Sequence, residues 1–224
     1  GGVSHNGVAN SGIQRSGLFD RMFIQPAAGD SGGAVGAALE GYWRAGEWPR
    51  IPQPAYDTCL GPAFDEPAIV KALEAHGLAF RKHAPDELCR EVARLVHDDL
   101  IVGWFQGRME FGPRALGHRS ILGNACNPET KEILNLRVKL REEFRPFAPV
   151  VTEDALQAYY DQPTPSPYML YAPRVKTGLE ARVPASTHVD GTSRVQTVSK
   201  AQDPLFYGLL KEFESLSGLP LLIN

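Results

Sequence analysis

The sequence predicts an α/β fold, and three observations carry this prediction. Short apolar runs, such as residues 100–105, have the length of buried strands. Longer segments, such as residues 85–99, repeat their apolar residues at helical spacing. The chain has 224 residues, of which 43% are hydrophobic and 22% are charged, so it can bury a core of ordinary size.

The first part of the chain suggests a strand, a glycine loop and a helix in succession. Residues 18–24 are an apolar run that we expect to be a buried strand, and the small residues of 34–43 predict a closely packed helix. The glycine-rich residues 25–33 between them form either an anion or nucleotide site or only a tight turn. Asp30 is a candidate metal ligand, although spacing alone favours a helix N-cap. We expect His5 to be a hydrogen-bonded turn residue.

A proline-rich stretch between residues 44 and 67 breaks every periodic pattern and predicts a domain boundary, which we place between residues 52 and 53. The helices expected beyond it are 65–78, 85–99, 128–138, 153–160 and 204–217, the last capped by Gly218. The expected strands are 100–105, 120–122, 149–151, 168–171, the segment that follows the Asp190-Gly191 turn up to Val198, and 219–224. Arg194 and Gln196 have the pattern of the solvent side of a half-buried strand.

Residues 107–120 carry Arg108, Arg114 and Arg119 among repeated glycines and a proline. An arginine fork binds phosphate or carboxylate oxygens bidentately and keeps its charge, and glycine lets backbone N–H groups approach the same anion. The alternative is a solvated face with surface ion pairs worth about 1 kcal/mol or less each. Because the apolar Phe111 lies within the segment, we expect a packed loop that binds an anion at the carboxyl end of a strand.

More cations follow this loop. Lys139, Arg141 and Arg145 lie shortly after it, and Arg194 comes later in the chain. Cations in the last turn of a helix also complement the helix dipole. This alternative stays open for Lys139 and Arg141 and applies best to Arg137. We expect the others to extend the anion site.

Composition excludes several classes of protein. A net charge of −3 argues against a nonspecific nucleic-acid or membrane binder, because such proteins carry a basic excess. The three cysteines form no close pair, which indicates a reducing compartment and hence the cytoplasm. No segment has the roughly 20 apolar residues of a membrane helix, and no signal peptide is recognisable. The chain opens without methionine and stops after an apolar strand pattern, so we expect a fragment of a longer protein.

Five segments together resemble the O-carbamoyltransferases of nodulation-factor and antibiotic biosynthesis, the nebramycin (tobramycin) type included. They are residues 1–6, 25–34, 107–117, 144–149 and 188–196. The resemblance implies that residues 1–52 are the C-terminal end of an actin-like (ASKHA) ATPase domain. Residues 53–224 would then be a YrdC-like α/β domain.

The resemblance also implies a reaction. The YrdC-like domain would form carbamoyl-adenylate from carbamoyl phosphate and ATP, and the carbamoyl group would pass to a hydroxyl of an acceptor metabolite at the actin-like domain. Asp30 matches a metal ligand of the actin-like domain in its Gly-Asp-x-Gly loop. The implied cofactors are ATP with Mg²⁺, and Fe²⁺ is a candidate for the metal of the actin-like domain. Most of that domain is the expected missing partner, and with it the expected histidine ligands.

The site residues expected on these grounds fall into three groups. Catalytic roles are expected for Arg108, Arg114, Arg119 and, as an acid or base, His118. Substrate or nucleotide binding is expected for Gly117, Ser120, Lys139, Arg141, Arg145, Arg194, Gly2, Asn6 and Gly32. Asp30 is the expected metal ligand. Two other functions stay open: a basic cleft that binds RNA without transferase activity, and a structural remnant that binds nothing.

Overall fold

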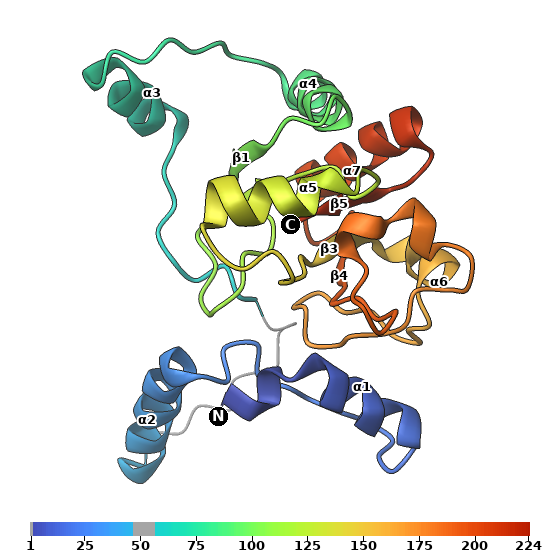
Figure 1. Ribbon diagram of the computed structural model, residues 1–224. Coiled ribbons are helices and arrows are strands. Elements are labelled where there is room, and N and C mark those ends of the chain that lie inside the picture. The colour runs from blue at the N-terminus through green and yellow to red at the C-terminus, as the bar shows by residue number, and fades with distance from the viewer. Residues whose placement is uncertain (1, 47–56) are drawn as a thin grey trace.

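The computed structural model describes residues 2–46 and 57–224, which form a mixed α/β structure, as expected (Figure 1). The domain boundary predicted between residues 52 and 53 lies outside the described residues, and it stays a prediction. An N-terminal segment with two helices lies beside a larger body that contains all the described strands (Figure 1).

The N-terminal segment contains the 3₁₀ turn η1 (Gly2–His5) and the helices α1 (Gly7–Ser16) and α2 (Asp30–Arg44). Helix α1 is absent from the sequence prediction because it has few apolar residues. It docks through polar side chains instead: the Asn10 amide donates to the Leu170 carbonyl at 2.9 Å, and the Ala172 amide N–H donates to the Ser11 hydroxyl at 2.9 Å. The α1 helix is therefore fixed to the larger body.

The strand predicted at residues 18–24 is wrong. These residues form no strand, and Leu18, Phe19 and Phe23 are 76%, 65% and 77% exposed. An apolar run becomes a strand only where a neighbouring strand and a core are present, and neither lies against this segment.

The described strands form two groups, a two-stranded sheet and a three-stranded sheet. Strand β1 (Val102–Phe105) pairs antiparallel with β2 (Arg119–Leu122). Strand β3 (Pro149–Thr152) lies between β4 (Gln196–Val198), which is parallel to it, and β5 (Leu221–Ile223), which is antiparallel. A bridge between Gly123 and Ile223 connects the two groups.

Most of the remaining helices pack around these strands (Figure 1). Their bounds are α3 (Glu66–Ala75), α4 (Pro85–His97), α5 (Glu129–Ile133), the π-helix η2 (Leu134–Lys139), η3 (Glu153–Ala155), α6 (Leu156–Tyr159), η4 (Glu180–Arg182), η5 (Pro184–Ser186) and α7 (Pro204–Ser217). Helix α7 ends at Gly218 with a φ of 73°, which confirms the predicted cap. Helix α3 buries none of its residues and stands apart from the body (Figure 1).

Two sequence expectations about the β-strands fail in the body. Residues 168–171 form no strand, although Met169 and Leu170 are buried as coil. Gln196 is only 2% exposed, so the polar face of β4 is not a solvent side. Its amide is satisfied internally, by the Leu116 carbonyl and by Asn224.

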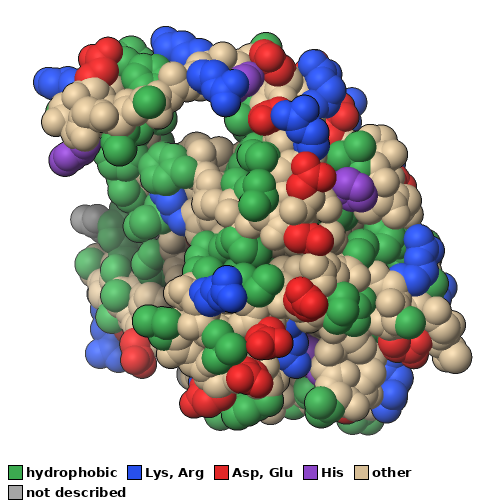
Figure 2. All heavy atoms as spheres, turned by 45° about the horizontal axis from the view of Figure 1, so that its top comes forward, with side chains coloured by type: hydrophobic (Ala, Val, Ile, Leu, Met, Phe, Trp, Pro, Cys, Tyr) green, Lys and Arg blue, Asp and Glu red, His purple; other side chains and the backbone are tan. Residues whose placement is uncertain are grey.

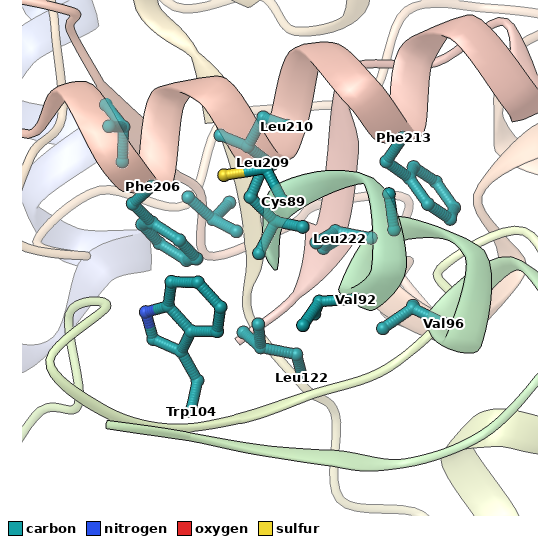
Figure 3. Close-up of a cluster of buried hydrophobic side chains, with 13 residues drawn as sticks. Cys89, Val92, Val96, Trp104, Leu122, Phe206, Leu209, Leu210, Phe213 and Leu222 are labelled. Atoms are coloured by element: carbon teal, nitrogen blue, oxygen red, sulfur yellow. The ribbon is translucent and has the colours of Figure 1, made fainter. Parts of the chain in front are cut away.

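The main core lies between helices α4 and α7 and the sheet. Figure 3 shows Phe213 of α7 near Val96 of α4, and Phe206 of α7 over Trp104 of β1. A second cluster of buried residues, which includes Leu134, Tyr160 and Ile223, lies outside this one. None of the helices in the described parts of the chain combines the length and apolarity needed to cross a membrane.

Leu209 tests the main core. Leu209→Ala should lower the free energy of unfolding by about 2–5 kcal/mol, because the side chain is fully buried and its removal leaves a cavity. Leu216→Ala on the same helix is the matched control, because Leu216 is 46% exposed. Urea unfolding followed by circular dichroism measures both variants, and equal losses would contradict this assignment of the core.

Candidate anion-binding site

The loop between β1 and β2 is folded around one buried carboxylate. The Oε1 atom of Glu110 accepts hydrogen bonds from the backbone N–H groups of Leu116, His118 and Arg119 at 2.7, 2.8 and 3.2 Å. Glu110 itself is 8% exposed. A charged acceptor that collects three backbone donors fixes the course of the chain between them.

Gly117 and Ser120 shape this loop. Gly117 has a φ of 108°, and a methyl group at this position would lie 2.5 Å from Phe206 Cδ1. The Ser120 hydroxyl accepts from the Gly117 N–H at 2.9 Å, and Ser120 is buried. Both residues were expected to bind substrate. In the structure Gly117 packs against Phe206 of α7, and Ser120 holds Gly117 in place.

Arg108 binds the neighbouring chain. Its guanidinium donates to the carbonyls of Gly61 and Leu60 at 3.0 and 2.7 Å, and the residue is exposed. Of the three loop arginines expected to be catalytic, Arg108 is the one that the structure places outside the cavity described below.

Arg119 has a mixed position. Its guanidinium lies 3.5 Å above the Phe105 ring and donates to the carbonyls of Gln106 and His118 at 2.7 and 2.8 Å. The residue also lines the cavity. Most N–H donors of Arg119 already have carbonyl partners. Arg119 therefore supplies positive charge to the cavity but few free hydrogen-bond donors.

The loop borders a cavity of about 260 Å³ that is lined by cationic side chains. These are Arg114, Arg119, Lys139, Arg141 and Arg194. No carboxylate side chain lines the cavity, and within the described residues none of the five cations lies within 4.0 Å of one. Figure 2 shows basic and acidic side chains interspersed over one outer face, whereas all the charged side chains that line the cavity are cations.

The cations of the cavity repel one another. Burial, followed by the charges of Arg114 and Arg141, lowers the pKa of Arg194 to about 10. Burial also lowers the pKa of Arg114. The Nε atoms of Arg114 and Arg194 are buried without a hydrogen-bond partner. A buried donor without a partner is costly, so this arrangement is suited to an anion that supplies the missing acceptors.

The π-helix η2 carries the next pair of cations. Lys139 is its last residue, Leu140 follows with a φ of 48°, and Arg141 lies over the Phe147 ring at 4.6 Å. The fully buried Asn135 accepts from Arg141 Nε at 2.7 Å through its Oδ1. π-Helical turns are rare and occur often at functional sites, and this one turns the chain back toward the cavity.

Arg145 lies outside the cavity. It is exposed, and its Nε is 3.4 Å from a carboxylate oxygen of Glu142, as in an ordinary surface ion pair. Its backbone carbonyl accepts from the Asn135 amide at 2.9 Å, which helps to hold the loop after η2.

His118 faces a different cavity of about 320 Å³. Its Nε2 atom is 3.4 Å from the Cys59 sulfur and 3.6 Å from Asp203 Oδ2. Burial, followed by the Asp57 carboxylate, raises the pKa of the Cys59 thiol to about 12, so this thiol stays protonated at neutral pH. The structure does not bring His118 into the cationic cavity, and its role as acid or base stays a prediction.

The expected binding residues of the N-terminal segment have local structural roles. The Asn6 side chain caps α1 by accepting from the Ala9 N–H at 3.1 Å. Gly32 lies against the Ala27 carbonyl, where any side chain would overlap the oxygen. Gly2 is exposed in η1.

Helix α2 begins at Asp30, and its N-cap residue is Gly29. The alternative prediction that Asp30 is the N-cap is therefore wrong. His5 is not hydrogen-bonded as expected: both ring nitrogens are buried without a partner, and burial followed by the Arg114 charge lowers its pKa. Within residues 2–46 and 57–224, no three side chains of His, Cys, Asp or Glu are grouped to hold a metal. A metal at Asp30 would therefore need ligands from outside the described residues.

Three polar residues at or behind the cavity were not predicted. Asn135 and Gln196 are buried amides that hold backbone segments beside the cavity through hydrogen bonds. Asn224 lines the cavity. Asn224 follows an apolar strand, a signal for a functional residue at a strand end. Nothing in the sequence distinguishes Asn135 from an exposed helical asparagine.

Comparison with protein families identifies two matching segments. Residues 93–224 match the family model described as "Carbamoyltransferase C-terminus", and residues 1–39 match the one described as "Carbamoyltransferase N-terminus".

Curated relatives match over the whole chain. The chain is 38% identical to nodulation protein NolO of Bradyrhizobium diazoefficiens over 230 residues, which is 100% of this chain and 41% of the relative. It is 37% identical to nodulation protein U of Sinorhizobium fredii over 224 residues, which is 100% of this chain and 38% of the relative. It is also 39% identical to the uncharacterized protein sll1178 of Synechocystis over 249 residues, which is 100% of this chain and 40% of the relative. The chain thus spans about two fifths of the length of these relatives.

Glu110 provides a test of the loop. Glu110→Gln should lower the free energy of unfolding by about 1–3 kcal/mol, because three backbone donors lose their charged acceptor. Glu143→Gln, at an exposed position, should change it by less than about 0.5 kcal/mol. Chemical denaturation measures both, and an unchanged Glu110→Gln midpoint would show that the carboxylate does not organise the loop.

Arg194 provides a test of the unbalanced charge. Its pKa of about 10 in the folded state is below the ordinary value, so at neutral pH the protonated side chain destabilises the folded protein. In phosphate-free buffer, Arg194→Met should therefore raise the free energy of unfolding by about 1–2 kcal/mol. Arg137→Met, on the exposed side of η2, should leave it unchanged. Thermal unfolding measures the effect, and a lower stability of Arg194→Met would contradict the assignment.

Proposed function

Because the chain belongs to the carbamoyltransferase family, we propose that it is the part of an ATP-dependent O-carbamoyltransferase that binds carbamoyl phosphate and the phosphates of ATP. One observation carries the proposal: the cationic cavity gathers five positive side chains without a carboxylate. Its volume of about 260 Å³ is suited to a small anion such as a phosphoryl group. In the proposed architecture residues 53–224 are YrdC-like, and they follow the end of an actin-like domain.

The proposed chemistry requires stabilisation of negative charge. Carbamoyl phosphate, ATP and water together give carbamoyl-adenylate, phosphate and pyrophosphate. Water first cleaves the bond between the carbamoyl oxygen and the phosphorus of carbamoyl phosphate, which releases phosphate and carbamate. A carbamate oxygen then forms a bond to the α-phosphorus of ATP while the bond between this phosphorus and pyrophosphate breaks. In the second step an acceptor hydroxyl attacks the carbamoyl carbon, and AMP leaves.

The charged side chains of the cavity match this chemistry. Phosphoryl transfer depends mainly on positioning and on charge stabilisation at the phosphoryl oxygens. Arg114 and Arg194 have unpaired donors for these oxygens, and Lys139 adds a mobile point charge. Mg²⁺ bound with ATP would neutralise part of the triphosphate charge.

An RNA-binding module is the alternative. RNA binding needs cations along an open surface, with exposed aromatic side chains for base stacking. Here the cations converge on a cavity, and the one aromatic ring among its lining residues, Phe147, is buried beneath Arg141. This arrangement supports the small-anion function.

The N-terminal segment supports the proposed contact with the rest of an actin-like domain. Val3, Leu18 and Phe19 are 87%, 76% and 65% exposed, and Trp43 on α2 is 59% exposed. So much exposed apolar surface marks an interaction site. We propose that the acceptor metabolite binds on that domain. Most of it would belong to the part of the relatives' length that this chain does not cover. Free cysteines such as Cys59 agree with the proposed cytoplasmic location.

Arg114 tests the proposal. Arg114→Gln in the full-length protein should reduce pyrophosphate release from ATP and carbamoyl phosphate by at least about 100-fold, because one charge-stabilising donor is lost. Ligand binding should also stabilise the unmodified protein by roughly 2.7 kcal/mol at 100 times the dissociation constant. Arg137→Gln, an exposed arginine of η2, is the matched control. Normal pyrophosphate release by Arg114→Gln would refute the proposed site.

A further inference from the structure

We propose that Asn224 is the residue that recognises the carbamoyl group in the cationic cavity, by accepting a hydrogen bond from its NH₂. This inference rests on the proposed function, because it assumes that carbamoyl phosphate binds among the cations. It assigns the selection of a carbamoyl over another acyl phosphate to one side-chain oxygen.

The side chains that line the cavity offer many hydrogen-bond donors and few acceptors. The five cations offer only donors, and the remaining side chains, apart from Asn224, are the apolar Pro113, Ala115, Ile121, Pro146, Phe147, Ala148 and Met169. Asn224 therefore brings the single side-chain oxygen acceptor among the lining residues in the described part of the chain. Its Oδ1 atom is buried and has no hydrogen-bond partner.

A relay of amides fixes which atom of Asn224 is the oxygen. Gln196 Nε2 donates to the Leu116 carbonyl at 2.8 Å, so the other amide atom of Gln196 must be its oxygen. That oxygen accepts from Asn224 Nδ2 at 2.6 Å. A reversed Asn224 amide would place two oxygens against each other, so Oδ1 is left as the free acceptor. The backbone N–H of Asn224 donates to the Ala148 carbonyl at 2.9 Å and anchors the residue beside the cavity.

The free acceptor and the unpaired donors suit different parts of one ligand. Phosphoryl oxygens satisfy the arginines but repel Oδ1, because both are acceptors. The carbamoyl NH₂ supplies the donor that Oδ1 lacks. Acetyl phosphate has the same charge and nearly the same shape, but its methyl group would leave Oδ1 buried and unpaired, which is costly. The cavity should therefore prefer carbamoyl phosphate over acetyl phosphate.

The experiment compares these two ligands on the full-length protein by calorimetry or thermal shift. The unmodified protein should bind carbamoyl phosphate at least about tenfold more tightly than acetyl phosphate. Asn224→Leu should abolish this preference while its affinity for acetyl phosphate stays within about twofold. Asn224→Asp keeps an acceptor but adds a negative charge, so it should weaken both ligands and retain the preference.

The outcomes separate the two proposals. A full preference in Asn224→Leu, or an equal loss of both ligands, would overturn the role of Asn224. Arg114→Gln tests the site itself: if it leaves the affinity of both phosphates unchanged, the cavity is not the phosphate site and the proposed function fails. Unfolding of each variant without ligand shows whether the protein still folds, and the ratio of the two affinities is unaffected by a change in the folded fraction.

Discussion

The carboxylate of Glu110 is the interaction on which the candidate site depends. It lies within the loop and accepts the N–H groups of three residues on the return path, so it holds the β1–β2 connection in one course. That course places Arg114 on the cavity side and turns Arg108 toward the carbonyls of Leu60 and Gly61. The fixed course of this loop thus leaves Arg114 at the cavity and Arg108 bound to the neighbouring chain.

The cavity also illustrates how a binding site opposes stability. Arg194 and its cationic neighbours are held together by the surrounding fold, although their charges repel and burial disfavours them. The core between α4 and α7 offsets this cost. A bound anion would reduce the repulsion between the cations and accept hydrogen bonds from the free donors. Much of its binding free energy would therefore come from removing interactions that destabilise the cavity without a ligand.

Local patterns predicted well those elements whose own apolar face is buried. Helices α4 and α7 and strands β1 and β3 were expected within a few residues of their observed bounds, because burial on one side imposes a period on the sequence. The segment 18–24 failed because an apolar run does not specify its own partner. Helix α1 was missed because it contacts the body through hydrogen bonds, which the Asn10 amide donates and the Ser11 hydroxyl accepts.

The site was predictable in composition but not in arrangement. Clustered cations predicted an anion site that includes Arg114, Lys139, Arg141 and Arg194, and the structure brings these four residues to one cavity. No local pattern could separate them from Arg145, whose position depends on where the chain turns after the π-helix. Tertiary contacts set these differences, so they appear only once the loops are folded.

The order of the strands has a consequence for how the protein is made. Strand β5 comes after all the other described strands in the chain, yet it pairs with β3 and its Ile223 bridges to Gly123, so it connects the two groups of strands. The two strand groups therefore stay separate on the ribosome until residue 223 has emerged. Because synthesis adds about 5–20 residues per second, β1 and β2 wait for several seconds with an uncovered edge. Chaperones that bind nascent chains would meet this intermediate, and Asn224 would complete the lining of the cationic cavity only after β5 has formed.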